Sequence, residues 1–157
     1  MRSVSFAIIT VSDTRKASSD SSGDAIRDLM SEVGHKLTRR AIVADDADQI
    51  QKALRECIED RNVQAVLLTG GTGISKRDVT LEAVEHFREK DLPGFGELFR
   101  SLSYDEIGSA AMMSRSSAFV SEGKLVFCLP GSEKAVRLAV RTLIAPEIGH
   151  MVWEANR

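Results

Sequence analysis

The feature that most constrains this chain is a short apolar run that leads directly into glycines. Residues 65–69 (Ala-Val-Leu-Leu-Thr) show no alternation of apolar and polar side chains, and Gly70, Gly71 and Gly73 come immediately afterwards. A strand without alternation is covered on both faces, as strands of parallel sheets are. Glycines at its exit let the backbone approach a ligand without Cβ clashes. We therefore expect an α/β fold in which this loop leaves the carboxyl end of a buried strand.

Strand-like and helix-like patterns alternate along the rest of the chain, which predicts a doubly wound sheet. Further strands are expected at 4–11, 37–43, 117–120 and 124–129, the last two joined as a β-hairpin. Helices are expected at 23–33, 50–58, 80–88, 97–113 with a break near 103, after 132 and from 146, with a turn at 92–96. The predicted fold class is α/β with three layers: a mostly parallel, mixed sheet with helices on both faces and a β-hairpin.

Length and charge exclude several classes of protein. A chain of 157 residues predicts one domain spanning 1–157. A net charge of −2 gives no basic field for nucleic acid or an anionic membrane, so neither is expected as a partner. The apolar run near the start is too short for a signal peptide or a membrane span, which predicts a cytoplasmic protein.

The cysteines and histidines carry no recognisable chemistry. Cys57 and Cys128 lie among apolar neighbours, so we expect both in the core rather than in a disulfide or a metal site. His35, His86 and His150 lack the spacing of metal ligands. The G-x-S-x-G pattern of serine hydrolases is absent from the sequence.

The loop after residues 65–69 crowds polar and basic side chains around its glycines. Thr69 and Thr72 offer hydroxyl groups, and Lys76 and Arg77 offer positive charge. Successive backbone N–H groups in such a loop can hold a phosphate. The loop matches neither the Walker A pattern nor the G-x-G-x-x-G fingerprint. A phosphate cradle and a tight structural turn with solvated charges are both open interpretations.

Carboxylates follow two neighbouring strands. Asp78 could hold Mg²⁺ beside a phosphate cradle, or it could cap the next helix. Asp45, Asp46 and Asp48 follow the strand at 37–43, where Asp46 and Asp48 suit a helix N-terminus. Because both loops leave the same edge of the sheet, one of these three carboxylates and Asp78 could face the same phosphate site. Such a pair suits phosphoryl or nucleotidyl transfer with a divalent metal ion.

Two further segments flank this edge. Ser12, Asp13 and residues 18–23 follow the first strand, and they form either a loop with a helix cap or a segment that closes over a ligand. Ser132 follows the Pro130-Gly131 turn and is placed to cap a helix, whose N-terminus would also suit a phosphate.

Several short motifs follow one another along the chain: Thr10–Asp13, Ser22–Gly23, Thr69–Gly73, Arg77–Thr80, Glu82, Pro93–Arg100, Ser114–Arg115 and Pro130–Ser132. Through these motifs the chain resembles, across nearly its whole length, the MogA/MoaB family of molybdopterin adenylyltransferases. Each string is common alone, but their ordered combination is specific. The segments 102–108 and 144–147 are closer to the MoaB branch.

The resemblance implies a molybdopterin-binding domain fold and a homo-oligomer, either a trimer or a dimer of trimers. It implies transfer of AMP from Mg-ATP to the terminal phosphate of molybdopterin, with release of pyrophosphate, as a step of molybdenum cofactor biosynthesis. A partner protein that inserts molybdate would then receive the product. The catalytic, metal-binding aspartates of the family fall on Asp45 and Asp78. The implied substrate-binding residues are Ser12, Asp13, Ser22, Gly23, Thr69, Gly70, Gly71, Thr72, Gly73, Arg77, Thr80, Glu82, Ser114, Arg115, Pro130, Gly131 and Ser132.

Two other functions agree with the same residues. A carrier would bind molybdopterin and pass it on without turning over ATP. An oligomeric scaffold would not need the pocket at all. Pyrophosphate release from ATP in the presence of molybdopterin separates the enzyme from both.

Overall fold

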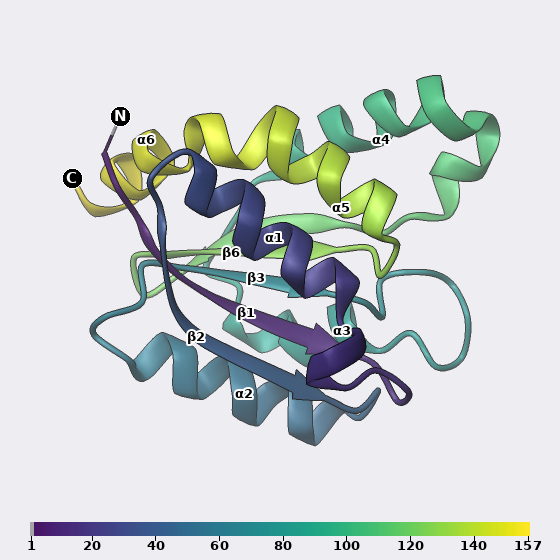
Figure 1. Ribbon diagram of the computed structural model, residues 1–157, viewed down its shortest axis with the longest axis horizontal. Helices are drawn as coiled ribbons and strands as arrows, with labels where there is room; N and C mark the ends of the chain where they lie inside the picture. Colours follow the sequence, from purple (N-terminus) through teal and green to yellow (C-terminus); the bar gives the residue numbers. More distant parts are fainter. Residues whose placement is uncertain (1) are drawn as a thin grey trace.

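A computed structural model describes residues 2–157 and shows one six-stranded sheet (Figure 1). The strand order is β2-β1-β3-β6-β5-β4. The bounds are β1 Ser5–Val11, β2 Lys36–Val43, β3 Ala65–Thr69, β4 Lys90–Asp91, β5 Ser117–Ser121 and β6 Lys124–Leu129. The first four strands in this order are parallel, and β5 and β4 are antiparallel to their neighbours. The prediction of a mostly parallel, mixed sheet is confirmed.

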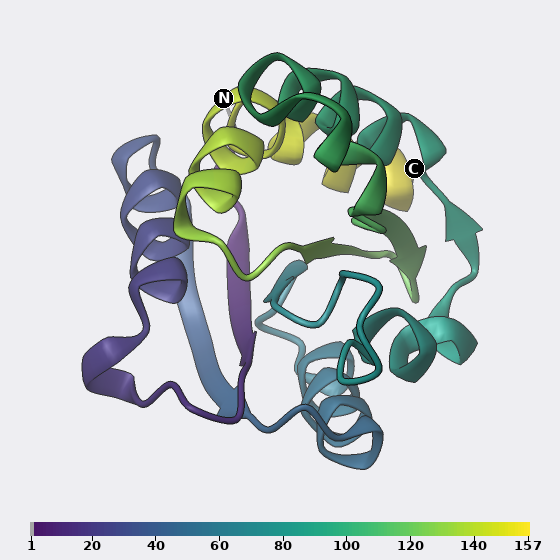
Figure 2. The same cartoon turned by 90° about the vertical axis from the view of Figure 1, so that its right-hand side faces the viewer.

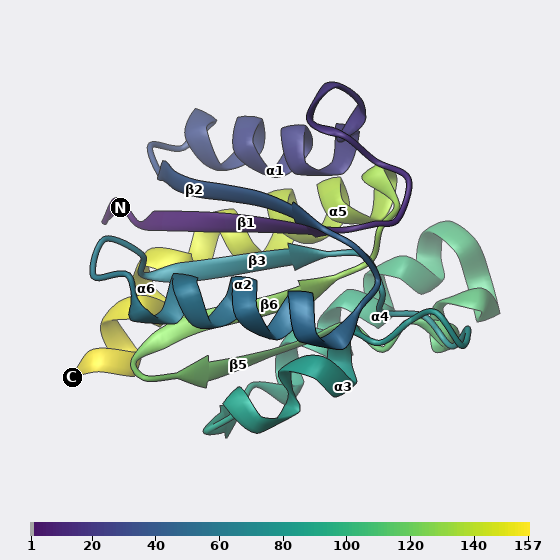
Figure 3. The same ribbon diagram turned by 90° about the horizontal axis from the view of Figure 1, so that it is seen from below.

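Helices cover both faces of the sheet. Their bounds are α1 Ser21–Glu32, α2 Ala47–Glu59, α3 Thr80–Val84, α4 Pro93–Ile107, α5 Glu133–Ala139 and α6 Ala145–Asn156. Helices α1, α4, α5 and α6 share one apolar core with the sheet, and α2 and α3 share the other (Figures 1 and 3). The three-layer α/β architecture predicted from the sequence is therefore confirmed.

The position of β3 in the sheet explains why its apolar and polar residues do not alternate. Ala65 and Leu67 belong to the core on the α1 side, whereas Val66 and Leu68 belong to the core on the α2 side. All five residues of β3 are buried. A strand covered on both faces has no position that must be polar, and its exit is consequently held in the middle of the carboxyl edge.

Helix α4 corrects two sequence predictions. The expected turn at 92–96 is wrong, because Pro93 occupies the first turn of α4, where the missing N–H of proline costs nothing. Gly96 belongs to the same turn, and a Cβ there would lie 2.8 Å from the Ser116 carbonyl oxygen, so this glycine serves close packing. The expected break near Ser103 is also wrong, since α4 continues to Ile107.

Shorter elements complete the connections. Two are 3-10 segments, η1 at Ala17–Ser19 and η2 at Glu85–Phe87, so the helix predicted for 80–88 is α-helical only to Val84. A third 3-10 segment, η3 at Gly108–Met113, follows α4. A π-helical turn, η4 at Val140–Ile144, joins α5 to α6. The two-residue strand β4 carried no detectable pattern in the sequence.

Several local predictions are confirmed. The β5–β6 hairpin turns at Glu122 (φ 49°) and Gly123 (φ 77°), both in the left-handed region that such turns require. Cys57 and Cys128 are buried, and burial raises the pKa of their thiols to about 11 and about 12 respectively. Both are thus packed as neutral apolar side chains. No helix within residues 2–157 has both the length and the apolarity to cross a bilayer.

Candidate functional site

A cavity of about 680 Å³ opens at the carboxyl edge of the parallel strands, the edge that faces the viewer in Figure 2. The loops after β1, β2, β3 and β6 form its walls, as expected for an open α/β sheet. Its lining residues are Thr10, Val11, Ser12, Arg15, Asp45, Thr69, Gly70, Gly71, Thr72, Gly73, Ser75, Arg77, Asp78, Met113, Ser114, Pro130, Gly131 and Ser132. A second cavity of about 440 Å³ lies around Arg2, Lys124 and Trp153, and it contains neither the glycine-rich loop nor paired aspartates.

The glycine-rich loop has a fixed shape. Gly70 adopts φ 106°, and a Cβ at this position would lie 2.2 Å from the carbonyl oxygen of Val11. Gly71 adopts φ 70°, and a Cβ there would lie 2.2 Å from Thr80 Oγ1. Both positions therefore require glycine for conformation as well as for space. The loop can bring its main chain to the cavity surface only with these residues.

Side chains outside the cavity hold this loop from two sides. Thr80 Oγ1 donates to the Gly70 carbonyl at 2.8 Å. Arg115 Nε donates to the Gly73 carbonyl at 2.8 Å, while its guanidinium pairs with Glu82 at 2.5 Å. Thr80, Glu82 and Arg115 do not line the cavity. Their position suggests support of the loop, whereas the sequence resemblance had placed them among substrate-binding residues.

Asp45 and Asp78 line the same cavity. The side chain of Asp45 is 15% exposed and lies 4.0 Å from the Arg77 guanidinium. Its backbone N–H donates to Asp13 Oδ1 at 2.9 Å, and Asp13 also forms an ion pair with Arg77. Asp13 borders the cavity through these contacts rather than lining it.

Crowding of negative charge at this wall affects the carboxyl of Asp45. Burial raises the pKa of Asp45, and the charge of Asp13 raises it further, followed by a smaller effect of Asp78. Arg77 opposes these effects without cancelling them. A cation bound between the carboxylates would relieve this repulsion and favour the ionised forms.

Asp78 does not cap α3. Its carboxylate accepts hydrogen bonds from Ser75 N at 2.9 Å and Ser75 Oγ at 2.8 Å, and Val79 occupies the N-cap position without a side-chain bond. The capping interpretation of Asp78 is therefore wrong. By contrast, Asp46 caps α2 by accepting from Gln49 N at 3.0 Å, and Asp48 lies in the first turn, so the helix-terminus interpretation of both is confirmed.

The two carboxylates fit a magnesium ion that arrives with a phosphate ligand. Within residues 2–157, no group of three His, Cys, Asp or Glu side chains is arranged to hold a metal ion. Mg²⁺ is commonly bound through one or two carboxylates, with phosphate oxygens and waters completing the coordination. Asp45 and Asp78 supply this donor set, and the glycine-rich loop lies beside them.

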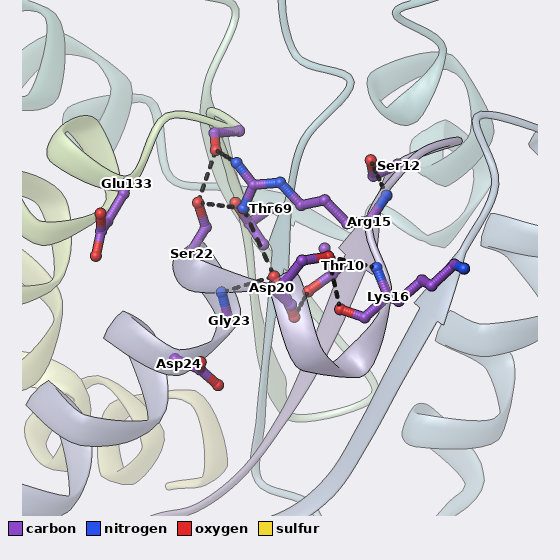
Figure 4. Close-up of polar contacts among 12 residues, drawn as sticks. Thr10, Ser12, Arg15, Lys16, Asp20, Ser22, Gly23, Asp24, Thr69 and Glu133 are labelled. Atoms are coloured by element: carbon purple, nitrogen blue, oxygen red, sulfur yellow. Dashed lines mark hydrogen bonds and ion pairs between the residues drawn. The ribbon is translucent and has the colours of Figure 1, made fainter.

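The opposite wall comes from the loop after β1 and the start of α5 (Figure 4). Arg15 donates to Ser22 Oγ at 2.9 Å, and Ser22 Oγ donates to the Gly131 carbonyl at 2.7 Å. Ser132 caps α5 by accepting from Ala135 N at 3.4 Å, which confirms the predicted cap. This wall carries hydroxyls and a guanidinium but no carboxylate that lines the cavity.

A fully buried carboxylate, Asp20, lies directly behind this wall (Figure 4). It accepts hydrogen bonds from Thr10 Oγ1 at 2.7 Å, Arg40 Nη2 at 2.9 Å and the Gly23 N–H at 3.0 Å. Burial alone would raise the pKa of Asp20, but these hydrogen bonds outweigh it and the pKa is lowered. The carboxyl is therefore ionised although water does not reach it.

Most of the expected site residues line the cavity, and a few lie behind the residues that line it. Ser12, Thr69, the 70–73 loop, Arg77, Ser114 and residues 130–132 line it together with Asp45 and Asp78. Ser22 and Gly23 belong to the first turn of α1, where Ser22 contacts the cavity wall at Gly131 and Gly23 binds Asp20. The sequence did not predict Thr10, Val11, Arg15, Ser75 and Met113 as lining residues, or Asp20 as a buried ion.

Replacing Asp20 by asparagine should make the protein less stable at neutral pH and less sensitive to acid. Because the pKa of Asp20 is lower in the folded state, the ionised carboxylate stabilises the fold above about pH 4 and loses this contribution as pH falls through the folded-state pKa. We expect the variant to lose about 2–3 kcal/mol at pH 7, because Arg40 would lack one of its two partners. Its unfolding free energy should also fall less steeply than that of the wild type between about pH 5 and pH 2.

Urea unfolding followed by circular dichroism across this pH range measures both effects. Asp28→Asn is the matched control, because Asp28 is an exposed member of an ion pair on the same helix. Parallel pH curves for Asp20→Asn and the wild type would contradict the expectation.

The chain is similar to known proteins along almost all of its length. Residues 7–150 match the family described as "Probable molybdopterin binding domain". Molybdenum cofactor biosynthesis protein B of Bacillus cereus is 49% identical over 151 residues, covering 96% of this chain and 89% of that protein. A crystal structure of a molybdenum cofactor biosynthesis protein B matches with a TM-score of 0.96 and 48% identity, covering 99% and 98% of the two chains. The tungsten cofactor synthesizing protein MoaB from Pyrococcus furiosus matches with a TM-score of 0.90 and 34% identity, covering 100% and 99%.

Proposed function

Since the chain belongs to the molybdopterin-binding family of molybdenum cofactor biosynthesis proteins, in the MoaB/MogA group, we propose that it adenylylates molybdopterin with Mg-ATP. A role in molybdenum cofactor biosynthesis follows from the relatives' names. The specific reaction is our proposal. The single observation that carries it is the presence of Asp45 and Asp78 on one cavity with the 70–73 loop. A binding site for molybdopterin alone would not need two carboxylates facing its phosphate.

The reaction joins two polyanions, so charge and position set its rate. An oxygen of the molybdopterin phosphate attacks the α-phosphorus of ATP. A new P–O bond forms, the bond from the α-phosphorus to the bridging oxygen breaks, and pyrophosphate leaves with the electron pair. No covalent bond to the protein is needed. Holding both reactants in one cavity converts a bimolecular encounter into an oriented one, which can supply a large part of the rate increase.

Each wall of the cavity has a role in this proposal. Asp45 and Asp78 would hold Mg²⁺, and the bound metal ion would neutralise charge on the nucleotide phosphates. Gly70 N–H is bonded to the Leu129 carbonyl, so the backbone N–H groups of residues 71–73 are the ones that would donate hydrogen bonds to phosphate oxygens. Thr69, Thr72 and Ser132 line the same space. Arg77 tempers the repulsion between the carboxylates through its contacts with Asp13 and Asp45.

The test is chemical detection of the product. The chain, Mg²⁺, molybdopterin and ATP labelled in its α-phosphate should yield labelled, adenylylated molybdopterin and an equal amount of pyrophosphate. Omitting molybdopterin should abolish pyrophosphate release. Binding of molybdopterin without pyrophosphate would instead identify a carrier, and absence of both binding and turnover would favour a scaffold.

We also propose that the chain assembles as a homo-oligomer, a trimer or a dimer of trimers, and that a molybdate-inserting protein receives its product. Support for assembly comes from large apolar side chains exposed along α4 and η3. Leu98, Tyr104, Ile107, Met112 and Met113 are between 47% and 78% exposed. Exposed apolar residues that gather on one segment of the surface, here α4 and η3, commonly mark a protein interface. Sedimentation velocity distinguishes a monomer, a trimer and a hexamer.

A further inference from the structure

The two walls of the cavity differ in chemistry, and this difference suggests which substrate lies on which side. Asp45 and Asp78 form one wall. Arg15, Ser12 and the Gly131–Ser132 turn belong to the other. A nucleotide that carries Mg²⁺ suits the first wall, because carboxylates attract the metal ion. A phosphate without a metal ion suits the second, where a guanidinium can bind its oxygens.

Arg15 is held in place by contacts that leave much of its binding capacity free. Its Nη1 donates to Ser22 Oγ at 2.9 Å, and its Nη2 donates to the Gly131 carbonyl at 3.3 Å. A guanidinium has five N–H donors, and within residues 2–157 the Arg15 guanidinium donates only these two hydrogen bonds. Its side chain is 29% exposed and lines the cavity.

Asp20 attracts Arg15 without neutralising it through direct hydrogen bonds. Arg15 Nη1 lies 3.7 Å from Asp20 Oδ1, whereas Thr10, Arg40 and the Gly23 N–H bind the same carboxylate at 3.0 Å or less. The buried charge therefore fixes where the guanidinium lies, and the guanidinium keeps donors for a ligand (Figure 4).

The other two arginines at the site are already engaged. Arg115 donates to the carbonyls of Gly73 and Asp78 and pairs with Glu82, and it does not line the cavity. Arg77 is paired with Asp13, lies near Asp45 and is 69% exposed on the acidic wall. Arg15 is thus the one cation on the wall away from the carboxylates among the described residues that line the cavity.

We propose that Arg15 binds the terminal phosphate of molybdopterin, the phosphate that attacks ATP, and that Asp20 is its positioning residue. This inference rests on the proposed function. It assigns the metal-free phosphate monoester to the wall formed by Arg15, Ser12 and the start of α5, and the Mg-nucleotide to the wall formed by Asp45 and Asp78. Arg15 binds the oxygens that do not react, so the remaining oxygen is directed toward the nucleotide.

The experiment measures the two ligands separately. Dissociation constants are determined for molybdopterin without ATP or Mg²⁺, and for Mg-ATP without molybdopterin, on the wild type, Arg15→Gln and Arg15→Lys. Arg39→Gln is the matched control, because Arg39 is another partly exposed arginine that forms ion pairs but lies outside the cavity. Thermal unfolding of each variant verifies that it is folded.

Arg15→Gln should weaken molybdopterin binding about tenfold to a hundredfold, the range for a lost charge-assisted hydrogen bond, and change Mg-ATP binding less than about threefold. Arg15→Lys should recover part of the affinity because it keeps the charge, and Arg39→Gln should match the wild type. Asp20→Asn should weaken molybdopterin binding in the wild-type background and much less in the Arg15→Gln background. If Asp20→Asn only destabilised the fold, it would weaken molybdopterin binding equally in both backgrounds. A smaller effect in the Arg15→Gln background therefore shows that Asp20 acts through Arg15.

Unchanged molybdopterin binding by Arg15→Gln, or equal loss for both ligands, would overturn the assignment. Neither result depends on turnover, because both ligands are measured alone. If the wild type binds molybdopterin through Arg15 but releases no pyrophosphate, the proposed reaction fails and the assignment of Arg15 survives. If the wild type turns over and Arg15→Gln matches its kcat and KM, the assignment fails and the reaction survives.

Discussion

The Asp78→Asn variant is expected to form adenylylated molybdopterin about a thousandfold more slowly than the wild type while remaining folded. The amide keeps an oxygen that can accept the hydrogen bonds from Ser75, so the loop should retain its shape. It loses the negative charge that attracts Mg²⁺, and a metal ion contributes several kcal/mol of charge stabilisation to phosphoryl transfer. Initial rates of pyrophosphate release with saturating molybdopterin and ATP measure the effect.

Asp48→Asn is the control for this substitution. Asp48 is exposed, lies in the first turn of α2 near the same edge of the sheet, and does not line the cavity. The Asp48→Asn variant should form adenylylated molybdopterin at the wild-type rate. Molybdopterin binding in the absence of Mg²⁺ should also be unchanged in Asp78→Asn, because the charge is needed only for the nucleotide. A turnover rate close to that of the wild type would remove Asp78 from the mechanism.

Gly70→Ala should have the second largest effect and should act on both stability and binding. The methyl group would lie 2.2 Å from the Val11 carbonyl oxygen, and φ 106° is a conformation that alanine avoids. Either β1 or the loop must move, so we expect a loss of about 3 kcal/mol or more of unfolding free energy. A displaced loop would also turn its N–H groups away from the cavity and abolish turnover.

Gly94→Ala provides the comparison within the same chain. Gly94 lies in the first turn of α4, and a Cβ there meets no other atom within 4 Å. Alanine favours helix over glycine by up to about 1 kcal/mol, so this variant should be as stable as the wild type or slightly more stable. Urea unfolding followed by circular dichroism measures both variants. Equal stability of Gly70→Ala and Gly94→Ala would show that the loop is not rigid.

The sheet could be predicted well from the sequence because a buried strand must consist mainly of apolar residues. Residues 65–68 are all apolar and Thr69 follows them, and the structure gives the predicted bounds, Ala65–Thr69, for β3. The hairpin was equally clear, since its turn at Glu122 and Gly123 needs a residue that tolerates positive φ. Local chemistry decides both features, and no distant contact is required.

Helix α4 was harder to predict because distant packing decides its start. Proline and two glycines at 93–96 favour a turn when read alone. In the structure, Phe95 and Phe99 pack into the core on the α1 side, and this burial compensates for the weak helix propensity of the glycines. A local pattern contains no information about that packing.

The site was predicted unevenly for a similar reason. Asp45 and Asp78 were placed at one edge because the topology of a parallel sheet brings the loops after its strands together. The hydrogen bonds of Asp78 with Ser75 depend on the path of the loop, and so does the 3.7 Å approach of Arg15 to Asp20. Neither depends on a spacing that a sequence reveals. A buried aspartate among serines at 18–23 looks like any other polar loop residue.

The most direct measurement of the central claim is a crystal structure of this protein with Mn²⁺ and a non-hydrolysable ATP analogue, in which anomalous scattering locates the metal ion. The account predicts one strong anomalous peak with oxygens of Asp45, Asp78 and the nucleotide phosphates in its coordination shell, about 2.0–2.2 Å away as is usual for Mg²⁺-like ions. A nucleotide bound in the cavity with its metal ion in contact with neither aspartate would contradict it.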